Sequence, residues 1–202
     1  MAEKEEIKDW IGNGKSVFRA LGANNLSDVE REKHDYYATD PKAMELLLEL
    51  ETFNHNVLEP SCGEGHLSKV LEQHGYNVTS RDLIDRGFGE PHRNFLTETE
   101  LFDGDIITNP PYKYAQEFVE KSLSLIPEGN RVAMFLKIQF LESKSRRVFF
   151  DENPPEVIYV SSSRIKCAMN GDFEQFKESA VCYCWFIWRK GFHGDPIIKW
   201  FN

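Results

Sequence analysis

Short apolar runs alternate with segments of helical periodicity along most of this chain. Short runs that are rich in β-branched and aromatic residues are expected to form strands. These runs are Asn56–Glu59, Tyr76–Ser80, a run ending at Ile106-Ile107, Arg131–Leu136, Val157–Val160 and Ala180–Trp188, with Ile197–Phe201 as an edge strand. Apolar residues at helical spacing predict helices over Ala43–Glu51, Leu67–His74 and Ala115–Leu125. Strands that alternate with helices are typical of a mostly parallel sheet, so we predict an α/β fold.

The chain divides into two regions by composition. Residues 1–35 are charged and are interrupted by Gly12, Gly14 and Gly22, which predicts an N-terminal extension; a flap over a ligand cleft is the functional alternative. Residues 36–202 contain no repeat, low-complexity tract or linker, so we predict one domain there. Within it, residues 161–172 are expected to form an irregular loop.

The most distinctive segment is Asn109-Pro110-Pro111-Tyr112, which follows an apolar run directly. Two prolines cannot continue a strand ladder because neither has a backbone donor, so the chain should leave the sheet rigid and extended. The Asn109 amide oxygen and the Pro110 carbonyl are hydrogen-bond acceptors, and Tyr112 offers a flat aromatic face. Two acceptors and a stacking surface suit a planar ring that carries an exocyclic amine. The alternative is a plain proline turn.

A second distinctive segment, Glu59-Pro60-Ser61-Cys62-Gly63-Glu64-Gly65, lies between a predicted strand and a predicted helix. Gly63 and Gly65 permit backbone angles that other residues resist, and they would let a ligand approach the main chain. The next predicted strand is followed by Asp82, whose carboxylate can accept hydrogen bonds from the hydroxyls of a ribose. Asp85 is an alternative for this role. Together these features predict a cofactor crevice at the carboxyl edge of the sheet.

The two segments resemble the motifs of a known enzyme family. The first is similar to the catalytic motif of S-adenosylmethionine-dependent methyltransferases that methylate amino groups, above all the N6-adenine DNA enzymes. The second is similar to their cofactor-binding motif, and the order of the two resembles the gamma-type enzymes, particularly small phage or prophage-borne members. The resemblance implies a Rossmann-like, seven-stranded, mostly parallel sheet with helices on both faces and the last strand or strands antiparallel. It also implies S-adenosylmethionine as the cofactor.

Further roles follow from the resemblance. The stretch 36–41 is similar to the family segment that closes over the methionine end of the cofactor. Asn94-Phe95-Leu96 resembles a third motif, usually Asp-Phe-Leu, whose acid accepts from the cofactor's adenine amine; Asn94 stands in its place. The implied cofactor-binding residues are Tyr37, Thr39, Glu59, Pro60, Cys62, Gly63, Gly65, Asp82, Leu83, Asn94, Phe95 and Asn109. The implied catalytic residues are Asn109, Pro110, Pro111 and Tyr112.

Charge limits how such a protein could hold a nucleic acid. The formal net charge of -9 opposes nonspecific adsorption to DNA or RNA, so docking would need a local basic patch. The candidate phosphate-binding residues are Lys137, Lys144, Arg146, Arg147, Arg164 and Lys166. The alternative for the first four is a solvated helical face.

The resemblance makes N6 of adenine in DNA the expected acceptor. RNA and protein glutamine are alternatives, because some of their methyltransferases share the Asn-Pro-Pro-Tyr chemistry. A noncatalytic, cofactor-binding regulatory module is a further alternative, but such a module needs neither Asn109 nor Tyr112. We expect no separate target-recognition domain, which leaves a specificity partner or a homodimer as options for partners.

Cysteine usage and hydropathy add two expectations. The four cysteines show no CxxC spacing, so we expect free thiols and no metal site. The N-terminus is charged rather than signal-like, and no apolar run approaches the length of a membrane span. We therefore expect a cytoplasmic protein that does not enter a membrane.

Overall fold

The computed structural model describes residues 37–202 except 164, 166 and 170–180. The predicted N-terminal extension (residues 1–35), Arg164, Lys166 and the side chain of Tyr37 lie outside the described residues. None of the helices in the described part of the chain has the length and apolar character needed to cross a membrane.

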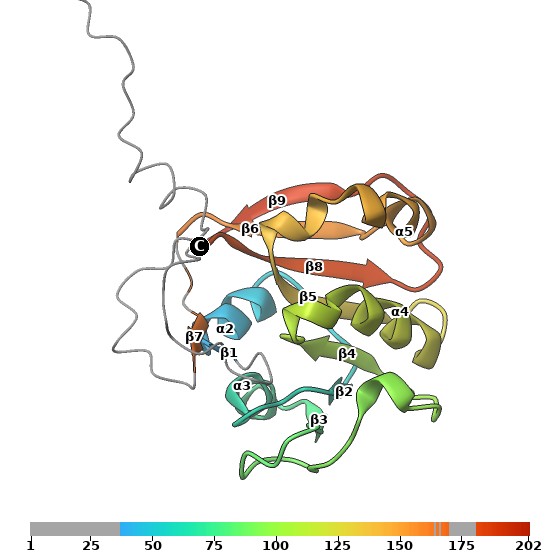
Figure 1. Cartoon of the computed structure of the whole chain (residues 1–202). Coiled ribbons are helices and arrows are strands. Elements are labelled where there is room, and N and C mark those ends of the chain that lie inside the picture. Colours follow the sequence, from blue (N-terminus) through green and yellow to red (C-terminus); the bar gives the residue numbers. More distant parts are fainter. Residues whose placement is uncertain (1–36, 164, 166, 170–180) are drawn as a thin grey trace, which may run out of the picture. The chain divides into compact units, whose positions relative to one another are not determined.

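Seven strands form one sheet in the order β3-β2-β4-β5-β8-β6-β9 (Figure 1). Their bounds are β2 (Asn56–Glu59), β3 (Asn77–Ser80), β4 (Asp105–Thr108), β5 (Arg131–Lys137), β6 (Val157–Ser161), β8 (Tyr183–Arg189) and β9 (Ile197–Phe201). Strand β8 runs antiparallel to β5 and β6, and the other neighbouring pairs of this sheet are parallel. The predicted seven-stranded, mostly parallel sheet is therefore confirmed. Its antiparallel strand is β8, and β9 is an edge strand parallel to β6.

Helices cover both faces of the sheet, as predicted. Helices α2 (Lys42–Leu48) and α3 (His66–Gln73) pack on one face, and α4 (Ala115–Leu125) and α5 (Arg147–Glu152) pack on the other. Successive residues of the central strands enter the two cores alternately: Ile107 packs with α2 and α3, and Ile106 packs with α4. Burial on both faces explains why Ile106 and Ile107 are adjacent in β4 and why the middle of β5 is a continuous apolar run.

A small second sheet was not predicted. Strand β1 (Tyr37–Thr39) lies beside β7 (Cys167–Met169) and pairs with it antiparallel (Figure 1). In this pair Thr39 lies opposite Cys167. The expectation that residues 161–172 form only an irregular loop was wrong, because this stretch contains β7. We call this pair of strands the β1–β7 ribbon.

A buried carboxylate joins three segments at the amino end of the sheet, away from the polar segments that follow the strands. Asp105, the first residue of β4, is only 3% exposed. Its Oδ2 accepts from the Asn54 backbone N–H at 2.7 Å, and its Oδ1 accepts from the Arg131 backbone N–H at 2.8 Å. One side chain thus aligns the starts of β2, β4 and β5.

Removing this carboxylate should destabilise the fold. Asp105→Ala leaves the N–H groups of Asn54 and Arg131 without their acceptor, and an unmade buried hydrogen bond costs roughly 1–3 kcal/mol. We expect urea denaturation to show a loss of about 2–4 kcal/mol in the free energy of unfolding. The exposed Asp103 gives a matched control, because Asp103→Ala should change stability by less than about 0.5 kcal/mol. Equal losses in the two variants would contradict the role of Asp105.

Candidate functional site

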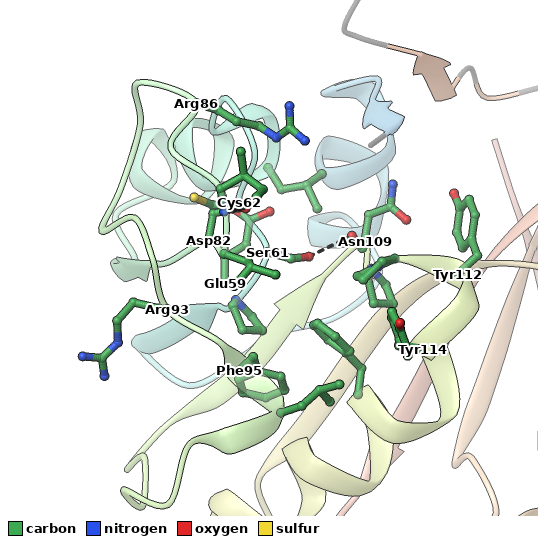
Figure 2. Close-up of a pocket in the computed structure, with 18 of the residues that line it drawn as sticks. Glu59, Ser61, Cys62, Asp82, Arg86, Arg93, Phe95, Asn109, Tyr112 and Tyr114 are labelled. Atoms are coloured by element: carbon green, nitrogen blue, oxygen red, sulfur yellow. Dashed lines mark hydrogen bonds between the residues drawn. The ribbon is translucent and has the colours of Figure 1, made fainter. Parts of the chain in front are cut away.

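A cavity of about 460 Å³ opens at the carboxyl ends of β2, β3 and β4 (Figure 2). The three strands are parallel neighbours, so the segments that follow them meet at one edge of the sheet. In open α/β sheets this edge is where ligands bind. The structure thus places a cavity where the sequence predicts a crevice.

Most of the predicted site residues line this cavity. The ones that do are Thr39, Glu59, Pro60, Cys62, Asp82, Leu83, Asn94, Phe95, Asn109, Pro110, Pro111 and Tyr112. Sequence reasoning missed Ala38, Ser61, His66, Leu67, Ile84, Arg86, Arg93, Leu96, Lys113, Tyr114 and Phe118. Several of these are direct neighbours of the motifs, so proximity in the sequence could have found them. Phe118 carries no such signal.

The Asp82 carboxylate holds the site together through the backbone. Its Oδ2 accepts from the Gly63 N–H at 2.8 Å, and its Oδ1 accepts from the Ile84 N–H at 2.9 Å. The side chain is 8% exposed and lines the cavity. Asp85 is exposed and is not among the described lining residues. Of the two acids considered for the ribose, the geometry favours Asp82, since each of its oxygens can accept a second hydrogen bond.

Glu59 is a buried acid at the carboxyl end of β2. The Ser68 hydroxyl donates to its Oε2, and Ser68 in turn hydrogen-bonds Ser80 at 2.6 Å. Burial raises the pKa of Glu59 to about 8, and the charge of Asp82 adds to the rise, while the hydrogen bonds from Ser68 oppose it. Near neutral pH the Glu59 carboxyl is therefore largely protonated and uncharged.

The two glycines of the Glu59–Gly65 segment shape the turn. Both have left-handed backbones, with φ of 56° at Gly63 and 79° at Gly65, which favour glycine. A Cβ on Gly65 would lie 2.5 Å from the Phe88 ring, so Phe88 already fills the space we expected a ligand to use. Neither glycine is among the described lining residues. Gly65 therefore serves the packing of Phe88, and Gly63 serves the hydrogen bond to Asp82.

The third motif contributes a capped turn and a buried ring. The Asn94 side chain accepts from the Leu96 backbone N–H at 3.2 Å and so caps the short helix η1 (Phe95–Thr97). Its oxygen retains capacity for a second hydrogen bond. Phe95 is 4% exposed and contacts Phe118, with ring centroids 5.1 Å apart. Phe95 therefore belongs to the core as well as to the cavity wall.

Asn109 lies at the end of β4, between the Glu59–Cys62 segment and Tyr112 (Figure 2). Its Nδ2 donates to Thr39 Oγ1 at 2.8 Å. Its backbone carbonyl accepts from the Ser61 hydroxyl at 3.1 Å, which ties β4 to the turn after β2. Both the side chain and the backbone of Asn109 are thus held by neighbouring elements.

Tyr112 packs more closely than its predicted stacking role requires. Its ring lies 6.1 Å from the Tyr183 ring, and the Lys137 ammonium lies 4.7 Å from its centroid. The hydroxyl donates to Cys167 Sγ at 3.7 Å. Burial is the main cause that raises the pKa of Tyr112 well above its usual value. The hydroxyl therefore stays protonated and remains a donor.

The predicted basic cluster does not form one uniform surface. Arg146 donates from Nε to the Phe140 carbonyl at 2.9 Å and from Nη2 to the Glu142 carbonyl at 3.2 Å, so its guanidinium stabilises local backbone. Arg147 is exposed and pairs with Asp151 at 3.0 Å. Lys137 lies over Tyr112, and Lys144 is exposed. Among the described members, Lys144 and Arg147 are the ones best placed to meet a phosphate.

The raised pKa of Glu59 predicts a pH-dependent stability. Because the pKa of Glu59 in the folded state, about 8, lies above the ordinary glutamate value of 4.5, the folded state holds the proton more tightly. The stability that the folded state gains by holding this proton is fully present below pH 4.5, falls as the pH rises towards 8, and is lost above pH 8. Glu59→Gln cannot ionise, so it should flatten this fall and be more stable than the wild type at pH 9.

Urea denaturation between pH 5 and pH 9 measures this effect. The exposed Glu64 lies in the same turn and gives the control, Glu64→Gln, which should keep the wild-type pH dependence. A Glu59→Gln profile parallel to that of the wild type would show that Glu59 is not the group that titrates.

Comparisons with known proteins bear on the fold. No family model matches the sequence, and no curated protein is similar to it in sequence. Solved structures do match. A protein from Listeria monocytogenes assigned to the class I S-adenosylmethionine-dependent methyltransferases superposes with a TM-score of 0.57 at 14% identity, covering 93% of this chain and 71% of its own.

Two further structures are similar in the same way. A protein from Pyrococcus horikoshii assigned as an RNA methyltransferase gives a TM-score of 0.56 at 15% identity, covering 89% of this chain and 99% of its own. The type IIG restriction endonuclease BpuSI gives a TM-score of 0.51 at 16% identity, covering 76% of this chain and 24% of its own. At these identities the likeness establishes the fold alone, and it is the Rossmann-like fold of class I methyltransferases.

Proposed function

We propose that this chain is an S-adenosylmethionine-dependent methyltransferase that acts on an exocyclic amino group, and that N6 of adenine in DNA is the acceptor. One observation carries the proposal. The Asn109-Pro110-Pro111-Tyr112 segment lines the same cavity as the Glu59–Cys62 turn and Asp82, in a class I methyltransferase fold. A cofactor crevice and a pair of amine acceptors are thereby brought together.

The cavity fits the cofactor in size and chemistry. Its volume of about 460 Å³ lies within the range of roughly 300–1,000 Å³ typical of ligand pockets. Asp82 offers carboxylate oxygens for ribose hydroxyls, and the buried ring of Phe95 offers an apolar wall for adenine. Bound S-adenosylmethionine would supply a methyl group on a positively charged sulfur; transfer breaks the bond between the methyl carbon and the sulfur, and the neutral thioether is a good leaving group.

The role of the chain in the reaction is to position the acceptor. The lone pair of the adenine amine is delocalised into the ring, which makes the nitrogen a weak nucleophile. Hydrogen bonds from the two amine protons to the Asn109 side-chain oxygen and the Pro110 carbonyl favour a more pyramidal, more nucleophilic nitrogen. Holding the nitrogen in line with the methyl group accounts for most of the rate in this proposal.

Docking of the nucleic acid rests on the exposed cations. In a chain of net charge -9, binding depends on local positive charge and should be sensitive to salt. Among the described residues Arg147 pairs with the exposed Asp151, and such a surface pair contributes little, so it can exchange for a phosphate. An adenine within duplex DNA would also have to leave the base stack, at a cost of a few kcal/mol.

Radiolabelled cofactor tests the reaction class. Incubation of the full chain with labelled S-adenosylmethionine and separate pools of DNA, RNA and protein should label DNA, with N6-methyladenine as the product on hydrolysis. Labelling of RNA or protein alone would support the proposed methyltransferase activity but show that the acceptor is not DNA. Cofactor binding by calorimetry without labelling of any pool would favour the regulatory module.

Asn109→Ala should separate catalysis from cofactor binding. The change removes one acceptor for the target amine, and this interaction matters most in the transition state, so transfer should fall by orders of magnitude while cofactor affinity stays near normal. Asn109→Asp should retain more activity than Asn109→Ala, because it keeps an acceptor oxygen.

Single-turnover kinetics measure the rate of methyl transfer, and calorimetry measures the affinity for the cofactor. Asn77, an exposed amide at the start of β3, provides the control variant Asn77→Ala. If Asn109→Ala transfers methyl at the wild-type rate, Asn109 is not an acceptor for the target amine, and the segment is a plain proline turn.

Lys144→Gln should weaken binding to DNA of any sequence. Loss of one phosphate contact lowers the slope of log affinity against log salt by about 1. Arg146→Gln is the contrasting variant, because its guanidinium is held by the Phe140 and Glu142 carbonyls and its loss should lower stability instead. Fluorescence anisotropy across salt concentrations measures the slope. An unchanged slope in Lys144→Gln would make Lys144 a solvated surface residue.

A further inference from the structure

We propose that the β1–β7 ribbon positions the transfer site, and that Thr39 is the positioning residue that sets which end of the Asn109 amide faces the acceptor. This inference rests on the proposed function. It assigns Thr39 a different role from the cofactor contact implied by family resemblance. It also gives the ribbon, which no sequence pattern indicated, a part in catalysis.

The first observation is a direct contact between the ribbon and Asn109. Asn109 Nδ2 donates to Thr39 Oγ1 at 2.8 Å, and Thr39 is only 3% exposed. A buried hydrogen bond of this length restrains the amide group, because breaking it leaves a polar atom without water to replace the partner. Thr39 therefore fixes both the position and the rotation of the Asn109 side chain.

The second observation concerns the direction of that hydrogen bond. A threonine hydroxyl can donate or accept, so Thr39 alone would tolerate either end of the amide. In the structure Asn109 Nδ2 is the donor and Thr39 Oγ1 is the acceptor. Cys167 lies opposite Thr39 in the ribbon, and its sulfur offers an acceptor for the Thr39 hydroxyl proton. With its proton on that side, Thr39 accepts from Asn109, which turns the amide nitrogen to Thr39 and the oxygen to the other side.

The third observation links the same sulfur to the other end of the motif. The Tyr112 hydroxyl donates to Cys167 Sγ at 3.7 Å, and Figure 2 shows Asn109 and Tyr112 projecting in the same direction from their segment. Cys167 therefore contacts Tyr112 directly and Asn109 through Thr39. A ribbon of two three-residue strands is not stable alone, so these contacts help to seat it on the motif as well.

The orientation of the amide has a chemical consequence. An amide oxygen accepts from the amine of adenine, whereas an amide nitrogen turned to the same place would bring two donors together. A reversed Asn109 is therefore expected to lose the interaction as completely as alanine does. The distinction between the two ends is made by Thr39 and Cys167.

Paired substitutions test this role. Thr39→Val removes the hydroxyl at nearly constant shape, and Thr39→Ser keeps it. We expect Thr39→Val to lower single-turnover transfer roughly 10- to 100-fold with little change in the affinity for S-adenosylmethionine, and Thr39→Ser to retain most of the rate. Cys167→Ala frees the Thr39 proton to donate to Asn109 and should act like Thr39→Val, whereas Cys167→Ser keeps an acceptor and should be milder.

A double-mutant cycle separates positioning from a general structural role. In the Asn109→Ala background, Thr39→Val should lower the rate no further, because the group it positions is gone. Additive losses, or a fall in melting temperature and cofactor affinity that accounts for the lost rate, would overturn the inference. Weakened cofactor binding in Thr39→Val with normal transfer at saturation would instead make Thr39 a cofactor contact. If the wild type methylates none of the pools, the proposed function fails; if it does and Thr39→Val matches it, only the positioning role fails.

Discussion

Burial of the sheet on both faces is the constraint on which the site depends. Strands β4 and β5 send successive side chains into two different cores, so within the sheet they have little room for polar groups. Polar chemistry is therefore displaced to the strand ends, where Asn109 follows β4 and Asp82 follows β3. Because β2, β3 and β4 are parallel neighbours, these ends share one edge. The same hydrophobic packing that holds the fold together thus gathers the candidate site.

Much of this arrangement could be predicted because it follows from local patterns. Apolar runs and helical spacing predicted the seven strands of the large sheet and helices α2, α3 and α4, with α4 at its observed bounds, but not α5. The β1–β7 ribbon escaped prediction because it pairs segments far apart in the sequence, neither of which has a strong strand pattern. The partners of Arg146 escaped prediction for another reason. Its partners are backbone carbonyls, and the direction of a carbonyl is known only once the chain has folded.

The acidic and basic side chains of the site lie on opposite sides of Asn109. Glu59 and Asp82 lie on one side of Asn109, and Lys137 lies over Tyr112 on the other. Of the two acids, Glu59 is largely uncharged near neutral pH, because its desolvation raises the pKa to about 8. The negative charge therefore rests mainly on Asp82, which has two backbone donors. This leaves the acidic character of the chain mainly at its surface, where it discourages nucleic acid from binding away from the cationic positions.

The thiol of Cys167 offers a chemical probe of the ribbon. Burial raises its pKa to about 11, and it contacts the Tyr112 hydroxyl, so it is a poor nucleophile at neutral pH. Alkylation of this half-buried thiol should therefore be slow. Its alkylation rate, followed by mass spectrometry, would report how well the ribbon and Tyr112 shield the sulfur. The chain thus carries its own probe of how the ribbon is seated against Asn109 and Tyr112.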